Sequence, residues 1–178
     1  GYTPAGLDLV AAISNEIHPT GTISADNPGK VALSFKHLLS KIRFTISTKI
    51  GDGYTLKISD MKFTATKTAD GAFDGADVTW TAVADGSNGE YTFEEIADLA
   101  NLEYETTTED GTMYTTSVEN VVIPQASTVS PDYVLAEVSF TVNLQGDNID
   151  EEGGITKTFT ADLSSTTDNA WKAGFAYN

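Results

Sequence analysis

Few residues in this chain are of types that carry out chemistry. The sequence has no cysteine and only two histidines, His18 and His37. Neither histidine stands in a nucleophile elbow, a phosphate-binding loop or a zinc-protease motif. The absence of cysteine excludes disulfides and thiol catalysis. We therefore expect no enzymatic activity, no catalytic residue and no cofactor, and we expect His37 to be a packed, hydrogen-bonded structural residue.

Carboxylates are the abundant reactive side chains. The chain has 26 acidic and 10 basic residues and a net charge of −16. Its densest acidic loop contains Asp147, Asp150 and Glu152, and carboxylate oxygens are ligands that Ca²⁺ prefers. The loop lacks EF-hand spacing, however, and acidic hairpin loops are usually only solvated. The negative charge argues against a nucleic acid partner, because a phosphate backbone attracts basic proteins.

The basic residues are concentrated in one part of the sequence. Eight of the ten lie between Lys30 and Lys67, where the only acidic residues are Asp52 and Asp60. If these basic side chains share a face, the molecule is electrostatically two-sided. The alternative is that they form the solvated faces of two neighbouring strands.

Several aromatic residues are candidates for stacking on sugars. They are Trp80, Tyr91, Tyr104, Tyr114 and Tyr133. Aromatic rings at strand positions also pack in a core or on a sheet surface, and the sequence leaves both interpretations open.

The elements that would carry these residues are strands. Apolar residues in 31–46 alternate first on odd positions, ending at Phe35, and then on even positions from Leu38 to Ile46. Because strand side chains have a period of two, this change of phase predicts a bulge or bend around Lys36–Leu38. The same kind of change in 54–66 predicts a second bulge near Ser59–Asp60. Strong β formers dominate most of the chain, which predicts an all-β fold.

The rest of the pattern predicts hairpins and one short helix. Residues 134–144 and 155–163 alternate cleanly and indicate an antiparallel pair. Gly51–Gly53 and Asp70–Gly71 are typical of tight turns. A capping box at Thr92–Glu95 predicts a helix of two to three turns over 92–100. The residues expected in the core are Phe35, Ile42, Phe44, Val138, Phe140, Phe159 and Trp171.

Three motifs in a fixed order resemble those of the fimbrillin family, the surface and pilus subunits of Bacteroides-type bacteria. The first, at residues 35–42, places Phe35, His37, Lys41 and Ile42 in the family's Phe-x-His-x-Leu-x-Lys-Ile pattern. The second is the Ile-Pro-Gln strand end at 123–125, where Pro124 must end a strand or lie on an edge. The third is the closing motif, which combines Trp171, Gly174 and Tyr177.

The closing motif has physical roles whatever its family. We expect Trp171 to be a core plug between sheets. Gly174 would allow a bend or a close backbone approach. Tyr177 would bury its ring and leave its hydroxyl at the rim.

The resemblance implies an antiparallel, transthyretin-like Greek-key β-sandwich with one or two short helices. It implies a single fimbrillin-like domain over residues 1–178, which could be a fragment of a larger two-domain lipoprotein, with residues 1–30 belonging to a preceding strand or domain. It also implies an exported, outer-membrane or fimbrial location, with a lipid anchor outside this chain as its only attachment to membrane.

The function that the resemblance implies is a non-enzymatic structural or adhesive fimbrial subunit that polymerises by strand exchange. Its partners would be other fimbrial subunits or a missing strand of the same protein, together with host or microbial surface ligands. The alternative is a monomeric glycan-binding or accessory lipoprotein on the same fold, because a fold does not determine a function.

Members of the family typically continue past the closing tyrosine with a further strand. We therefore expect an incomplete sheet edge beside Tyr177 or the first strand, filled by a neighbouring subunit or by another segment of the protein.

Overall fold

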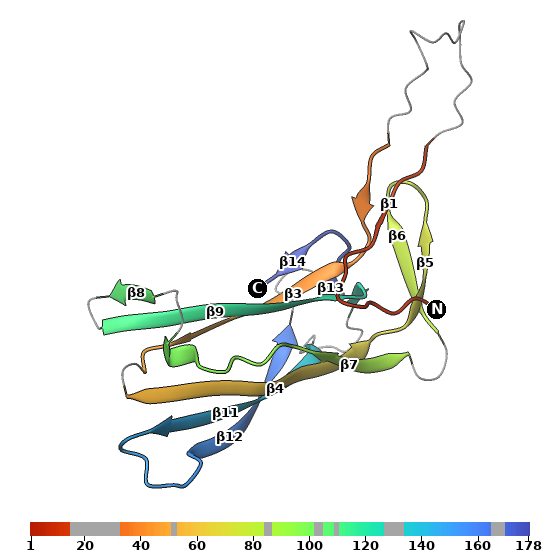
Figure 1. The fold of residues 1–178 in the computed structure, drawn as a ribbon. Helices are drawn as coiled ribbons and strands as arrows, with labels where there is room; N and C mark the ends of the chain where they lie inside the picture. Colours follow the sequence, from red (N-terminus) through yellow and green to blue (C-terminus); the bar gives the residue numbers. More distant parts are fainter. Residues whose placement is uncertain are drawn as a thin grey trace, which may run out of the picture.

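A computed structural model describes residues 1–14, 33–50, 53–83, 87–101, 105–108, 111–126, 134–164 and 170–178. These residues form mainly strands, arranged as two four-stranded sheets and three two-stranded ribbons. Figure 1 shows the two sheets as layers, with the β1–β2 and β5–β6 ribbons rising from one end. The prediction of a β-rich fold is confirmed.

The first large sheet has the strand order β14-β3-β9-β8. Its strands are β3 (Ser40–Thr48), β8 (Glu105–Thr108), β9 (Gly111–Val122) and β14 (Ala176–Tyr177). β3 pairs with β9 along its whole length in antiparallel register. β14 pairs with β3 in parallel, an exception to the expected antiparallel arrangement.

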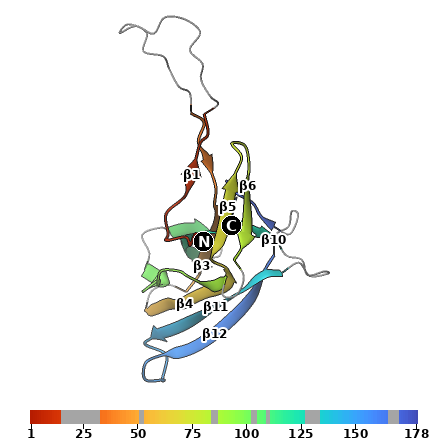
Figure 2. The same cartoon turned by 90° about the vertical axis from the view of Figure 1, so that its right-hand side faces the viewer.

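The second large sheet has the strand order β12-β11-β4-β7. Its strands are β4 (Tyr54–Thr66), β7 (Asn88–Thr92), β11 (Val134–Gly146) and β12 (Ile155–Ser164). All three pairings are antiparallel, and the predicted pairing of the two clean strands is that of β11 with β12. Figure 2 shows β4, β11 and β12 stacked in this order away from the first sheet.

Three ribbons complete the described fold. They are β1 (Val10–Ala11) with β2 (Lys36–His37), β5 (Ala69–Phe73) with β6 (Val78–Ala82), and β10 (Gln125–Ala126) with β13 (Ala170–Trp171). In the second of these ribbons the ring of Trp80 lies so close to Gly71 that a Cβ there would approach it to 2.9 Å. A larger residue at position 71 would force the Trp80 ring to move, which favours glycine there.

The larger hydrophobic core draws side chains from both large sheets. Ile42 and Val122 come from the first sheet, and Phe63 and Val138 from the second. The ring of Phe63 contacts that of Trp171, with 5.5 Å between their centroids. A smaller cluster of Leu39, Ala69, Val121 and Ile123 is covered by Tyr2, Leu9 and Trp80. Shared burial of this kind joins the two sheets into one packed unit.

Both predicted bulges correspond to real irregularities. β4 gains one residue over β11 between Ser59 and Lys62, and Asp60 there has a positive φ of 52°. Asp is one of the few residue types that tolerates this conformation. At the other site the chain leaves β2, which pairs with β1, and enters β3 in a different sheet. The change of phase therefore marks a change of sheet.

The predicted helix over 92–100 is wrong. The amide of Phe93 donates to the carbonyl of Met61, and Ile96 and Ile58 exchange both backbone hydrogen bonds at 2.9 Å. Pairing with β4 thus overrides the local helix signal. The helical structure among the described residues is one 3₁₀ turn, η1 (Leu99–Asn101), and none of it is long and apolar enough to cross a membrane.

Two predicted turns also need correction. β3 and β4 belong to different sheets, so Gly51–Gly53 does not close a hairpin between paired strands; Gly51 and Asp52 themselves lie outside the described residues. Asp70 and Gly71 lie inside β5, and the chain turns at Asp74–Asp77 instead. The Asp74 carboxylate accepts both turn amides at 2.8 Å, and these hydrogen bonds hold its pKa below the ordinary value.

Two of the expected core residues are exposed. Phe35 is 62% exposed, because it precedes a ribbon that lies outside the two sheets. Phe159 is 40% exposed, because it lies on edge strand β12 and only Phe140 stacks on it. The other expected core residues are buried or half-buried: Ile42, Val138 and Trp171 are buried, and Phe44 and Phe140 are half-buried.

This difference in burial predicts different stability losses. We expect Phe63→Ala to lower the free energy of unfolding by about 3–5 kcal/mol, the usual cost of removing a buried aromatic ring. We expect Phe159→Ala to cost about 1 kcal/mol, because it loses one ring pair at an exposed site. Chemical denaturation of both variants measures the difference; similar losses at the two positions would mean that the inner face of β12 is covered.

Candidate functional site

The closing motif fastens the end of the described chain to the first sheet. Trp171 is buried, and its backbone pairs with Gln125. The hydroxyl of Ser40, which is itself buried, donates to the carbonyl of Lys172 at 2.7 Å. Trp171 thus occupies the core position predicted for it.

Gly174 makes the turn that brings β14 alongside β3. It has a positive φ of 78°, a conformation that favours glycine. Its amide donates to the carbonyl of Leu39, and the amide of Lys41 donates to the carbonyl of Phe175, both at 2.9 Å. The predicted bend at this glycine is therefore what allows the parallel contact between the two strands.

Tyr177 closes the motif on itself. Its ring is half-buried against the larger core, and its hydroxyl accepts a hydrogen bond from the amide of Lys172 at 2.8 Å. Beyond it, the hydroxyl of Thr45 donates to the side chain of Asn178. The ring is packed and the hydroxyl lies at the rim, as predicted.

The Ile-Pro-Gln motif joins the two large sheets. Pro124 lies between β9 and β10, where no ladder amide is needed. The side chain of Gln125 accepts the amide of Thr66 at 3.1 Å and donates to the carbonyl of Ile123 at 3.3 Å. A side-chain amide thus links the end of β4 to the segment that follows β9.

Tyr91 makes the same link with its hydroxyl. The hydroxyl donates to the carbonyl of Thr66 at 2.8 Å and accepts from the amide of Ile123 at 3.2 Å. Burial raises the pKa of Tyr91 to about 12. From the sequence, Tyr91 is a candidate for sugar stacking or for packing, because nothing in local spacing signals a hydroxyl that reaches across two sheets.

One edge of the first sheet lacks a described partner over most of its length. β14 pairs only with Lys41 and Ile42. Because alternate residues of an antiparallel strand point their amides to opposite sides, Arg43, Thr45 and Ser47 direct theirs away from β9, as Lys41 does. The pairing of Ile42 with Tyr177 uses the amide of Arg43, and beyond Arg43 no described strand pairs with this side of β3.

The facing edge of the second sheet is also uncovered. β12 pairs only with β11 among the described strands. Its inner row consists of Ile155, Lys157, Phe159, Ala161 and Leu163. Ile155 is 49% exposed, and a hollow of about 180 Å³ separates Leu163 from Phe44 of β3. We call the unpaired part of β3, residues 44–48, together with this inner row the open side.

The opposite side of the molecule is closed. The side chain of Asn120 on β9 donates to the carbonyl of Thr92 at the end of β7, at 2.9 Å. Ile96, Leu99 and Ala100 are buried in the same region. The two sheets therefore meet on the β7–β9 side and remain separate on the β3–β12 side.

Basic residues lie on the outer faces of both sheets and are paired with carboxylates. Lys41 and Arg43 of β3 both contact Glu119, at 2.7 and 2.8 Å, and their hydrogen bonds hold the pKa of Glu119 below its ordinary value. Lys57 and Lys62 of β4 pair with Glu95 and Glu90. Because β3 and β4 lie in different sheets, these four basic residues do not form one basic face.

His37 is hydrogen-bonded but not packed. Its ring is 63% exposed, and its Nδ1 contacts the carboxylate of Asp8. It pairs with Val10 in the β1–β2 ribbon. The prediction that His37 is hydrogen-bonded is confirmed. The prediction that it is packed is wrong, because this ribbon lies outside the core. His18 lies outside the described residues.

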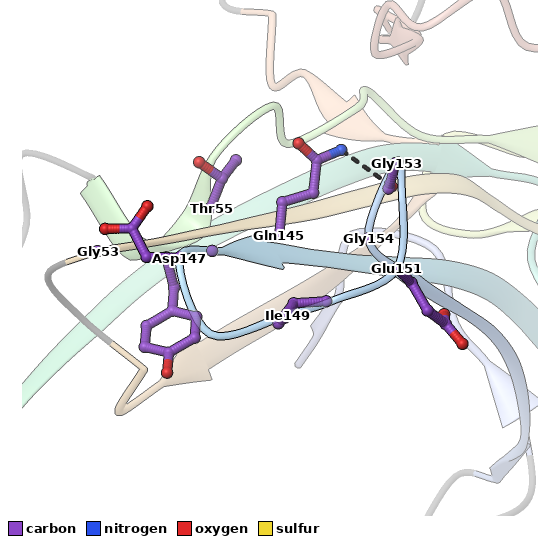
Figure 3. Close-up of a pocket in the computed structure, with 10 residues that line it drawn as sticks. Gly53, Thr55, Gln145, Asp147, Ile149, Glu151, Gly153 and Gly154 are labelled. Atoms are coloured by element: carbon purple, nitrogen blue, oxygen red, sulfur yellow. Dashed lines mark hydrogen bonds between the residues drawn. The ribbon is translucent and has the colours of Figure 1, made fainter.

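The acidic loop lines a hollow of about 530 Å³ together with Tyr54 and its neighbours. Figure 3 shows the carboxylates of Asp147 and Glu151 pointing away from one another at its rim. Asp147, Asp150 and Glu152 are all exposed. Within the described part of the chain no three acidic or histidine side chains are grouped as metal ligands, so the structure does not bring this set together.

The described sugar-stacking candidates present no exposed ring. Tyr91 is buried, and Trp80 is half-buried with its Nε1 donating to the carbonyl of Leu38 at 2.9 Å. Tyr114 is half-buried on β9. Tyr104 and Tyr133 lie outside the described residues.

One comparison with known proteins identifies a related family. A family model described as fimbrillin-like matches residues 2–178. No curated protein and no solved structure matches the chain.

Gly174→Ala tests the turn that places β14. A Cβ at this position would meet only the carbonyl oxygen and Cβ of His37 at ordinary contact distances, so the cost comes from the positive φ. We expect the free energy of unfolding to fall by about 1–2 kcal/mol. Denaturation of the variant measures this loss. Gly53 also has a positive φ but lies away from the motif, so Gly53→Ala shows how much stability a positive φ alone costs. An unchanged stability for Gly174→Ala would mean that β14 is not held by this turn.

Tyr91→Phe tests the hydroxyl link between the sheets. We expect a loss of about 1–3 kcal/mol, because the part-buried carbonyl of Thr66 and the buried amide of Ile123 lose their partner. The folded pKa lies above the ordinary value of about 10, so the fold favours the neutral ring. This stabilisation is complete below pH 10 and is lost as the pH rises through about 12.

The measurement is the free energy of unfolding between pH 8 and 12. We expect it to fall more steeply in the wild type than in Tyr91→Phe over the last two pH units. Tyr114→Phe is the matched control and should follow the wild type. Parallel curves for wild type and Tyr91→Phe would contradict the assignment.

Proposed function

The chain belongs to the fimbrillin-like family, and we propose from this that it is a non-enzymatic structural or adhesive subunit of a bacterial surface fimbria. Membership of this family suggests a fimbrial or adhesive surface protein and association with other fimbrial subunits. The proposal goes further in one respect: subunits would assemble by adding a strand of one to the sheet edge of the next.

The observation that carries this proposal is the open side. Strand addition needs unpaired backbone groups for affinity and a row of uncovered apolar side chains for specificity. β3 offers unpaired backbone groups beyond its pairing with β14. The inner row of β12 offers uncovered apolar side chains, with Ile155 and Phe159 about half-exposed. An uncovered edge of this kind is otherwise an aggregation hazard, so a natural occupant explains why it is present.

Several further proposals follow from the family. The two facing sheets would be a transthyretin-like Greek-key sandwich, residues 1–178 would form a single domain, and the whole protein would be a lipoprotein exported to the outer membrane. Asp147, Asp150 and Glu152 remain a calcium proposal of low priority, because the structure does not group them. The motif residues Phe35, His37, Lys41, Ile42, Pro124, Trp171, Gly174 and Tyr177 are proposed as structural.

The alternative, a monomeric glycan-binding or accessory lipoprotein, has less support. Glycan binding by stacking needs an exposed aromatic ring. The candidates Trp80, Tyr91 and Tyr114 do not supply one, and the exposed rings of Phe35 and Phe175 lack the polar handle of Tyr and Trp. The two functions would differ in solution: saturable binding of a defined oligosaccharide by a stable monomer would favour the alternative.

Thr45→Pro tests strand addition directly. The amide of Thr45 points to the unpaired side of β3, so proline there removes a docking amide without taking a hydrogen bond from β9. We expect the full-length processed protein to associate with rising concentration in sedimentation velocity. We expect Thr45→Pro to remain monomeric with an unchanged far-UV circular dichroism spectrum.

Ile46→Pro is the matched control, because its amide points to β9 and its loss should destabilise the fold itself. If the wild type stays monomeric at all concentrations, or if Thr45→Pro associates as well as the wild type, strand addition at β3 is wrong.

A further inference from the structure

Lys157 is an unusual residue on the open side. It stands in the inner row of β12, between Ile155 and Phe159, and pairs across the strand with Val142 of β11. Its Nζ lies 5.2 Å from the centroid of the Phe159 ring, which places the charge on the face that the core uses. A cation in the apolar row of an edge strand calls for a physical explanation.

The environment of Lys157 differs from that of the other lysines in the two large sheets. Lys41, Lys57 and Lys62 lie on outer faces, each with a carboxylate 2.7–2.9 Å from its Nζ. For Lys157 the described residues supply an aromatic ring and no carboxylate. The chain has 26 acidic residues, so a carboxylate partner would not be rare. The charge of Lys157 therefore faces whatever covers this inner row.

An inward-pointing lysine on an edge strand discourages indiscriminate pairing, because an added strand would bury an unpaired ammonium group. A carboxylate on the added strand removes that cost. A strand added to β3 faces the inner row of β12 across the space between the two sheets, which packed sheets keep at about 10 Å. A lysine and a glutamate side chain that point toward each other can span this distance together. The same charge that rejects an all-apolar strand therefore accepts one with an acidic residue in the correct register.

We infer that Lys157 selects the strand that fills the open side, and that this strand carries a carboxylate opposite Lys157 and apolar side chains two and four residues away, opposite Phe159 and Ala161. The occupant is an extended segment of another polypeptide chain with this alternating pattern. The inference rests on the proposed strand addition and specifies what that addition recognises. Charge complementarity of this kind fixes register and excludes wrong partners.

Two synthetic peptides test the inference. Both alternate valine and threonine; one has a glutamate in place of a central valine and the other has a lysine there. Fluorescence anisotropy measures their affinity for the full chain. We expect the wild type to bind the glutamate peptide about tenfold or more tightly than the lysine peptide, Lys157→Gln to lose this preference, and Lys157→Glu to reverse it.

Lys57→Glu is the matched control, because it changes the net charge equally on the outer face of β4. It should keep the preference of the wild type. If Lys57→Glu reverses the preference as well, or if the wild type binds both peptides equally, selection by Lys157 is wrong although strand addition stands. If neither peptide binds, strand addition at the open side fails and the inference fails with it.

Discussion

The fold depends on a link between its two sheets at Tyr91. The ring of Tyr91 packs against Phe63 in the larger core, and its hydroxyl holds the carbonyl of Thr66 and the amide of Ile123. Gln125 repeats the link beside it through the amide of Thr66. Since buried backbone groups must be paired, these contacts determine how the end of β4 meets the end of β9. The position of the sheets relative to each other follows from this junction.

With the sheets fixed there, the molecule is closed on one side and open on the other. Asn120 and the segment around Ile96 seal the β7–β9 side. On the other side the only described strand beside β3 is β14, which pairs with two of its residues. The closed side contributes buried contacts, whereas the open side leaves backbone groups and apolar side chains uncovered by described residues. The same asymmetry explains why Phe63 is buried and Phe159 is not.

Periodicity predicted the strands well and their surroundings poorly. The change of phase in 54–66 located the bulge at Asp60, and clean alternation predicted the pairing of β11 with β12. Alternation shows which side chains share a face, but it does not show whether anything covers that face, so Phe35 and Phe159 were wrongly expected in the core. The capping box at Thr92 signalled a helix that pairing with β4 prevents. The hydroxyl of Tyr91 matters only through contacts with distant segments, which no local pattern encodes.

The pairing of β3 with β9 has a consequence for how the chain folds. Ser40 pairs with Val122 and Thr48 with Tyr114, so the ladder encloses the whole stretch that carries β4 to β8. Closing so long a loop costs entropy before any of its contacts form. Chains dominated by such distant pairings fold in about milliseconds to seconds, whereas helical bundles can fold in microseconds. During that interval the apolar rows of the unpaired strands face solvent, and neighbouring chains in the same compartment can reach them before the native partner does.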